Sequence, residues 1–206
     1  MSTLIKTGPV LLVPPQHPAN SVKELVEQAK KKPSPPTFAN TGIGSSSHLA
    51  SELLKLASGV NFPSIPYKGD TPAIADLLGG HVDQLFVPLT AALPQVKGGK
   101  LKALAITSEQ RASSLPDVPT MIESGYKDVN IASWIGLAGP ANLPAPILKK
   151  LNREVQAVLQ EPEVRDRLLG MGLTPTVESP KEAADFIASE VSKYSKVVKE
   201  SNIVVR

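Results

Sequence analysis

Cysteine is absent from this chain of 206 residues. That absence excludes a disulfide framework, a thiolate metal site and a cysteine nucleophile. Aromatic residues make up only 4% of the chain, too few for the stacking platforms of proteins that bind single-stranded nucleic acid. The three histidines, His17, His48 and His81, lack the spacing of a metal site. We therefore expect no metal, no cofactor and no nucleic-acid partner.

An excess of charge of either sign and a long apolar run are also missing. Lys and Arg number 22 against 19 Asp and Glu, which is typical of a mixed solvated surface. The longest apolar run, Val10–Val13, has the length of a strand, far below the ~20 residues of a membrane span. The first fifteen residues contain one lysine and a short apolar patch but no cleavage site of small residues. We expect no export signal within this chain.

Proline is abundant, at 20 residues, about twice the usual share. The prolines stand at the edges of expected elements, as in Val13-Pro14-Pro15, Thr71-Pro72 and Ser179-Pro180. Prolines at the edges of elements are typical of an α/β chain with tight turns rather than of a linker.

The first half of the chain alternates between strand and helix patterns. Strands are predicted at Val10–Pro14, Pro36–Thr41, Phe62–Tyr67, Val82–Val87 and Leu101–Thr107. Helices are predicted after the capping box that Ser21 opens, from Ser45 to Ser58, after an N-cap at Thr71, and from Thr90 to the Gly98-Gly99 stop. This alternation predicts an α/β fold with a mostly parallel five-stranded sheet over residues 10–107.

The pattern of predicted elements changes after residue 107. A rigid loop over Leu115–Thr120 precedes a short helix capped by Thr120 and Glu123, and a strand is predicted at Val129–Leu137. Helices then dominate, at 144–160, 162–169 and 180–200, with a short strand at 173–177. We place a domain boundary near residues 126–140.

The stretch from Asn40 to His48 is the strongest candidate for a binding site. It reads Asn-Thr-Gly-Ile-Gly-Ser-Ser-Ser-His, follows a predicted strand and opens a helix. Its two glycines allow a tight turn, and the helix start exposes N–H groups at the positive end of the macrodipole. Such a turn suits a carboxylate or a phosphate.

Other interpretations of this stretch remain open. A polar turn with a serine N-cap would give the same pattern. The third glycine of a dinucleotide fingerprint is replaced by Ser47, and no Gly-Lys-Ser/Thr follows, so neither nucleotide motif is complete. Ser46 or Ser47 with His48 does not form a nucleophile elbow either.

Two further polar turns accompany the predicted strands. Lys68 lies in a Tyr-Lys-Gly-Asp turn after a strand, where open α/β sheets bind ligands, and its charge would complement an anion. Asp83 stands at the start of the next strand, where it is either a solvated turn residue or part of the site.

An ordered set of motifs resembles one family. The motifs are Thr41-Gly-Ile-Gly-Ser-Ser-Ser-His48-Leu49, Pro66-Tyr-Lys-Gly69, Asp76-Leu-Leu-Gly-Gly80 with Val82-Asp83, Gly99-Lys-Leu-Lys-Ala-Leu-Ala-Ile-Thr107, Arg111, and Leu115-Pro-Asp-Val-Pro-Thr120 with Glu123-Ser-Gly125. Together they resemble the Bug (TctC-type) family, the extracytoplasmic solute receptors of tripartite tricarboxylate transporters. The resemblance extends from about Leu4 to Arg206.

This resemblance implies a type II periplasmic-binding-protein fold with two lobes, a periplasmic location, and a non-enzymatic function. Residues 1–128 would be the second ligand-binding lobe, and 129–206 the mainly helical C-terminal part of the first. A small carboxylate or related metabolite would be bound and delivered to membrane transporter subunits. The ligand-binding set would be Asn40, Thr41, Gly42, Gly44, Ser45, Ser46, His48, Lys68 and Asp83.

The chain departs from the family at its beginning. Family chains start with a signal peptide, a first-lobe strand and a glycine-containing anion loop, and none of these precedes Ser2. We therefore expect a truncated receptor with impaired binding and a homodimer formed through the C-terminal helices. The alternatives are an α/β enzyme that depends on a phosphate ligand and an assembly module that binds no small molecule.

Overall fold

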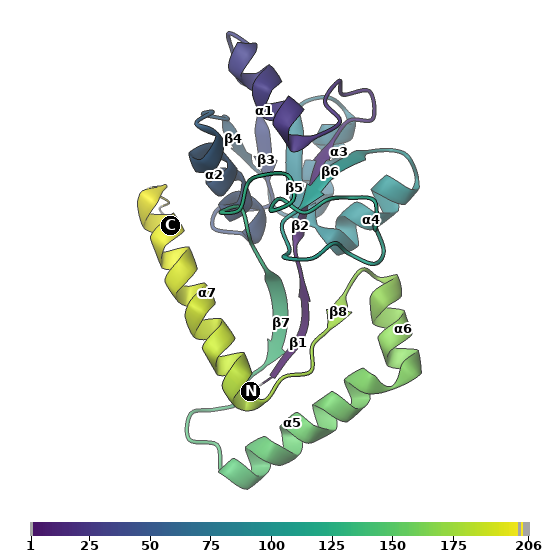
Figure 1. The fold of residues 1–206 in the computed structure, drawn as a ribbon, viewed down its shortest axis with the longest axis vertical. Coiled ribbons are helices and arrows are strands. Elements are labelled where there is room, and N and C mark those ends of the chain that lie inside the picture. The colour runs from purple at the N-terminus through teal and green to yellow at the C-terminus, as the bar shows by residue number, and fades with distance from the viewer. Residues whose placement is uncertain (1, 202, 204–206) are drawn as a thin grey trace.

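The computed structural model describes residues 2–201 and residue 203, and it contains two sheets (Figure 1). The strands are β1 (Ser2–Thr7), β2 (Pro9–Val13), β3 (Phe38–Asn40), β4 (Ser64–Pro66), β5 (Gln84–Pro88), β6 (Lys102–Ile106), β7 (Ser133–Leu137) and β8 (Thr174–Pro175). The helices are α1 (Val22–Lys31), α2 (Ser46–Ser58), α3 (Asp70–Leu78), α4 (Leu89–Lys97), α5 (Ala145–Gln160), α6 (Pro162–Gly170) and α7 (Pro180–Glu200). Among the described residues, none of these helices is both long and apolar enough to cross a membrane.

The five-stranded sheet has the order β4-β3-β5-β2-β6. β3 pairs in parallel with β4 and β5, whereas β2 is antiparallel to both β5 and β6. Four strands therefore run in one direction and β2 alone runs against them. The mostly parallel α/β sheet predicted over 10–107 is confirmed. β2 continues directly from β1, and the connections through α2 and α3 return β4 and β5 parallel to β3.

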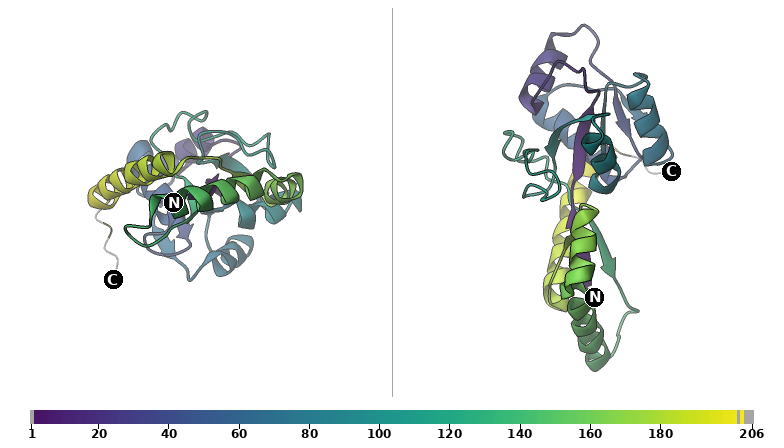
Figure 2. Two further views of the ribbon diagram at one scale, coloured as in Figure 1. Left: turned by 90° about the horizontal axis from the view of Figure 1, so that it is seen from below. Right: turned by 90° about the vertical axis from the view of Figure 1, so that its right-hand side faces the viewer.

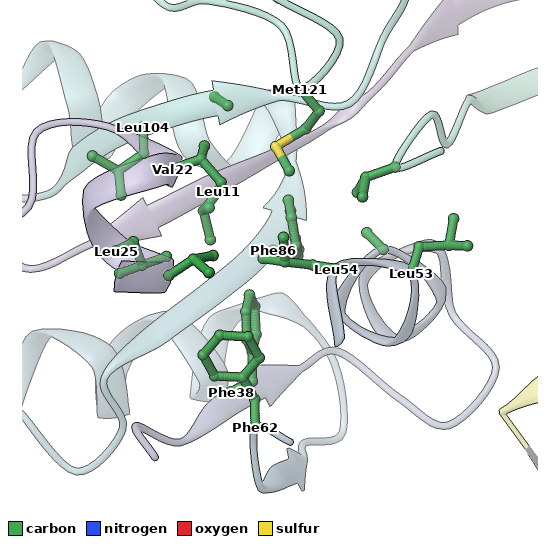
Figure 3. Close-up of a cluster of buried hydrophobic side chains, with 14 of the residues drawn as sticks. Leu11, Val22, Leu25, Phe38, Leu53, Leu54, Phe62, Phe86, Leu104 and Met121 are labelled. Atoms are coloured by element: carbon green, nitrogen blue, oxygen red, sulfur yellow. The ribbon is translucent and has the colours of Figure 1, made fainter. Parts of the chain in front are cut away.

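Two hydrophobic clusters cover the two faces of this sheet. β2 alternates between them, with Leu11 and Val13 in one cluster and Val10 and Leu12 in the other. The first cluster joins the sheet to α1 and α2 and contains three aromatic rings. The ring of Phe38 is stacked on that of Phe86 at 5.3 Å and meets that of Phe62 edge-on at 5.6 Å (Figure 3). The second cluster includes side chains from α3 and α4, so this part of the molecule is a three-layer sandwich.

The three-stranded sheet, of order β7-β1-β8, contains a strand that the sequence analysis missed. β1 pairs antiparallel with β7, from Ser2 opposite Leu137 to Thr7 opposite Ser133, and with β8 on its other side. α5 and α7 both contact β1, and the Trp134 ring of β7 meets the Phe186 ring of α7 edge-on at 6.0 Å. The C-terminal helices are therefore partly covered by a sheet of their own chain, while apolar side chains such as Ile147, Leu151 and Val191 stay exposed.

The division into 1–128 and 129–206 stays a prediction, but the strand pairing places residues 2–7 with the C-terminal part. The right-hand view of Figure 2 shows the three-stranded part as a narrow extension of the five-stranded part, and Figure 1 shows α7 running along both. The end of α7 reaches α2, where Val197 enters the first hydrophobic cluster.

Two expected local features differ in the structure. α3 begins at Asp70 with Gly69 as its N-cap, so Thr71 is not the cap. The segment after Thr120 forms turns rather than a helix, although the side chains of Thr120 and Glu123 accept each other's backbone N–H at 3.0 and 2.7 Å. Only one turn forms: the Ser124 N–H donates to the Thr120 carbonyl at 3.0 Å, and Gly125, with a φ of 92°, then leads the chain out of the turn.

Candidate ligand-binding site

The candidate site lies at the carboxyl ends of two neighbouring parallel strands. β3 ends at Asn40 and β4 at Pro66, and the Tyr67 N–H donates to the Asn40 carbonyl at 2.9 Å. α2 begins after the first strand and α3 after the second, so two helix amino termini open at the same edge of the sheet. Open α/β sheets bind ligands at such an edge.

Asn40 shapes the turn between β3 and α2. Its side chain is buried, its Oδ1 accepts the Gly42 N–H at 3.1 Å, and its Nδ2 donates to Ser64 Oγ at 2.8 Å. Gly42 has a φ of 142° and Gly44 a φ of 77°, values that favour glycine. The sequence prediction that these two glycines turn the chain is confirmed, while Asn40 supports the turn instead of facing solvent.

The hydroxyl groups of the turn have different partners. Ser45 is the N-cap of α2, and its Oγ accepts the His48 N–H at 3.2 Å. Ser46 Oγ lies 3.1 Å from Ser133 Oγ at the start of β7. Ser47 is fully buried, and its hydroxyl donates to the Phe86 carbonyl. The hydroxyls of Ser45 and Ser46 therefore remain at the sheet edge, and that of Ser47 belongs to the core.

The first turn of α2 also supplies backbone donors. The N–H groups of Ser46 and Ser47 precede the fourth helical residue and have no acceptor within the helix. These N–H groups and the helix dipole make this end of α2 electropositive.

His48 is held as an acceptor. Its Nδ1 accepts the Gly44 N–H at 3.1 Å, and its Nε2 lies 3.7 Å from Glu52 Oε1. Burial lowers the pKa of His48, although the Glu52 carboxylate opposes that shift. With Nδ1 as an acceptor, the proton of the neutral ring is on Nε2, so only Nε2 can donate a hydrogen bond to an anion, and that expected donation stays a prediction.

Thr41 links the turn to α3. Its hydroxyl donates to Ser45 Oγ at 3.5 Å and lies close enough to the Asp70 carboxyl to influence its pKa. Burial raises the pKa of Asp70, and the Thr41 hydroxyl opposes that rise. Asp70, like Ser133, was missed as a site residue because only the fold brings it to the turn.

Lys68 and Asp83 lie in different places. Lys68 is exposed after β4, at the same edge as the turn. Asp83 precedes β5, and its carboxylate accepts the N–H and the hydroxyl of Thr37, both at the start of β3, at 2.7 and 2.8 Å. Because Asp83 lies at the amino ends of the parallel strands, it is separated from the turn by the length of β3. Its role in ligand binding stays a prediction, and in the structure its carboxylate holds Thr37 at the opposite end of β3 from the turn.

Comparison with known proteins identifies the family. The family described as the tripartite tricarboxylate transporter family receptor matches residues 1–203. The chain belongs to this family. BugT of Bordetella pertussis is 36% identical over 93% of this chain and 59% of BugT. The periplasmic binding protein BugD is 36% identical, with a TM-score of 0.82 over 98% of this chain and 68% of BugD. A protein of R. palustris, solved with adipate, is 30% identical, with a TM-score of 0.85 over 98% of this chain and 68% of its own.

These matches confirm the family resemblance and the periplasmic-binding-protein fold. The family is periplasmic, and its members are solute receptors rather than enzymes. The chain spans 59% of the length of BugT and about two thirds of the solved structures that it matches.

Proposed function

We propose that this chain is a solute receptor that binds a small dicarboxylate at the turn between β3 and α2 and delivers it to a tripartite membrane transporter in the periplasm. The observation that carries this proposal is the meeting of two helix amino termini, those of α2 and α3, at one edge of the sheet. The adipate in the R. palustris relative supports the ligand class.

The geometry suggests how the turn would hold a carboxylate. The N–H groups of Ser46 and Ser47 would donate to one carboxylate, and the Ser45 and Ser46 hydroxyls offer further donors beside them. Lys68 would attract the anion from solvent. Ser46 Oγ contacts Ser133 Oγ where the two sheets approach each other. A ligand bound at the turn would therefore lie next to the junction between the two parts of the molecule.

Neither of two enzymatic functions, that of a serine hydrolase or that of an enzyme with a phosphate ligand, is favoured at the turn. A serine hydrolase needs a serine hydroxyl that donates to a histidine, but His48 Nδ1 is occupied by Gly44 and Ser47 Oγ by Phe86. An enzyme with a phosphate ligand would need further groups beyond the anion turn, and the family consists of receptors.

We expect the 206-residue polypeptide to bind its ligand less tightly than a relative of full length. The proposed contacts come from one sheet edge, while the relatives are about half as long again. This chain would make fewer contacts with the opposite side of the ligand than the longer relatives do. Fewer contacts offset less of the entropy that is lost on association, so the affinity is lower.

We also propose that the chain forms a homodimer through its C-terminal part. Large apolar side chains are exposed there on β7, α5 and α7, namely Ile135, Leu137, Ile147, Leu151, Val158 and Val191. The accessible surface of the chain is 11056 Å², roughly a fifth more than the about 9,300 Å² expected of a compact monomer of this mass. The excess is about twice the roughly 800 Å² that each partner buries in a standard interface, so a second copy would cover it only through a larger interface.

Removal of one backbone donor tests the ligand site. Ser46 is the first residue of α2, a position that tolerates proline, and α7 already has Pro180 at the equivalent place. Ser45, the residue before it, is extended, as a following proline requires. Ser46→Pro therefore deletes the N–H while α2 stays intact.

Calorimetric titration with adipate gives the result. We expect Ser46→Pro to weaken binding more than about tenfold, because a hydrogen bond to a charged group contributes about 1.5–3 kcal/mol. The control Ser46→Ala loses only the hydroxyl, and its affinity for adipate should fall only severalfold. Equal affinity of Ser46→Pro and the unaltered chain, with α2 shown to be folded, would remove the turn from the site.

A further inference from the structure

The side chain of His48 fixes the orientation of one peptide group in the turn. Its Nδ1 accepts the Gly44 N–H at 3.1 Å, across a single turn of chain. Because a trans peptide is planar, the Ile43 carbonyl must then point away from the ring. Gly44 has a positive φ and Ser45 N–H donates back to the Gly42 carbonyl at 3.1 Å, so the tilt of this peptide sets the path of the whole turn.

A cavity lined by both polar and apolar side chains lies beside the ring. It has a volume of about 320 Å³ and is bounded by α2, by Ser64 on β4 and by residues 201 and 203. That space holds roughly ten waters at liquid density, enough to carry protons to the ring. Ser201 Oγ, which lies there, is buried without a hydrogen-bond partner in the protein. The edge of His48 is therefore in contact with solvent, although its side chain is only 12% exposed.

Within the part of the chain that the structure describes, the charged groups around the ring come from α2. Glu52, which is buried, lies 3.7 Å from His48 Nε2 and accepts from Lys55 Nζ at 2.9 Å. The described side chains that face the same cavity from the other elements, Asn40, Ser64, Pro66, Ser201 and Ile203, carry no charge. The Lys55 ammonium pairs with Glu52, so little net negative charge is left to favour a protonated imidazole.

From this arrangement we propose that His48 is a positioning residue that holds the turn in its binding shape as a neutral acceptor, and that protonation of its ring releases the turn. A protonated ring would place the Nδ1–H against the Gly44 N–H, and two donors at 3.1 Å must move apart. The burial that lowers the pKa of His48 keeps the acceptor form at neutral pH. The consequence for ligand affinity rests on the proposed function: the receptor binds at neutral pH and loosens its hold on a dicarboxylate in acid.

The role of His48 can be tested without any ligand. In the ¹⁵N-labelled chain titrated from pH 8 to pH 5, we expect Nδ1 to have the chemical shift of an unprotonated nitrogen at neutral pH. The Gly44 amide should titrate with the same midpoint as the ring, below 6.5. In His48→Asn, whose side-chain oxygen replaces Nδ1 but cannot be protonated, the Gly44 amide should stay constant over this range. The control His81→Asn, at an exposed histidine beyond α3, should leave the Gly44 titration unchanged.

Adipate affinity at pH 7.5 and pH 5.5 provides the second measurement. His48→Asn should bind within about twofold of the unaltered chain at pH 7.5, whereas His48→Leu, without an acceptor, should bind several times more weakly. Between the two pH values the unaltered chain should lose severalfold more affinity than His48→Asn, and protonation of adipate affects both equally.

The outcomes separate the two proposals. The positioning role of His48 is overturned if Nδ1 carries a proton at neutral pH. It is also overturned if the chemical shift of the Gly44 amide does not change as the ring titrates. Identical pH profiles of adipate affinity in the unaltered chain and His48→Asn overturn its effect on binding. A failure of every variant to bind adipate at pH 7.5 overturns the proposed function, while the amide titration still decides the role of His48.

Discussion

Asn40 is the side chain on which the shape of the candidate site most depends. It is 1% exposed and uses both ends of its amide, one for the Gly42 N–H and one for Ser64 Oγ. Asn40→Ala removes both bonds and leaves the Gly42 N–H unpaired. We expect a loss of about 2 kcal/mol in the free energy of unfolding, measured by urea denaturation. The exposed Asn61 is a matched control, and a loss no greater than that of Asn61→Ala would contradict this role.

Two histidines make stability depend on pH. Burial lowers the pKa of His17 and of His48 below the usual 6.5, and the Nδ1 of each accepts a backbone N–H. Since the unfolded chain binds these protons first, the stabilisation is complete above about pH 6.5 and is lost as the pH falls through the folded-state pKa values.

Urea unfolding at pH 7.5, 6.5 and 5.5 measures this effect. The variant with both His17→Asn and His48→Asn should lose less stability on acidification than the unaltered chain, because asparagine keeps an acceptor without titrating. Parallel stability curves for the two proteins would show that these histidines do not titrate as described.

At the scale of elements, the capping box of α7 offers a clear test. Ser179 Oγ accepts the Glu182 N–H at 3.2 Å, and the Glu182 carboxylate accepts the Ser179 N–H at 2.8 Å. Ser179→Ala should lower the free energy of unfolding by about 1 kcal/mol. Ser192→Ala, at an exposed site on the same helix, should change it by less than about 0.5 kcal/mol. If the two variants have equal stability, the capping box does not stabilise α7.

Local signals predicted most of these elements. Ser45, Ser179 and Gly59 mark helix ends by their own hydrogen bonds and backbone angles, and each of them lies at the end expected from the sequence. The alternation of strands and helices likewise predicted the five-stranded sheet, because strand-to-helix connections are local.

Features that depend on distant segments were not predictable in this way. β1 was missed because its partners, β7 and β8, lie more than 120 residues away along the chain. Asp83 was included through the family resemblance, although its position at the start of a predicted strand puts it at the amino ends of the parallel strands. Asp70 and Ser133 reach the turn only through tertiary packing, so the sequence around Asn40 to His48 contained no sign of them.

For the molecule as a whole, we expect two copies of the chain to associate through the narrow C-terminal part (Figure 2). In analytical ultracentrifugation the mass should rise with concentration toward that of a dimer. Ile135→Lys together with Leu151→Glu should shift the chain to monomer, because both side chains are exposed and apolar. Leu78→Glu, at an exposed leucine on α3 in the other part of the molecule, should leave the equilibrium unchanged. A monomeric mass at every concentration, with a cooperative melt, would mean that the chain needs no such partner.

Binding of a dicarboxylate at the turn is the central claim, and amide chemical shifts during an adipate titration test it most directly. We expect saturable changes at Gly42, Gly44 and the first turn of α2, with smaller changes at the start of α3, where Asp70 lies near Thr41. Changes confined to other segments, with residues 40–48 unaffected at saturation, would contradict the account.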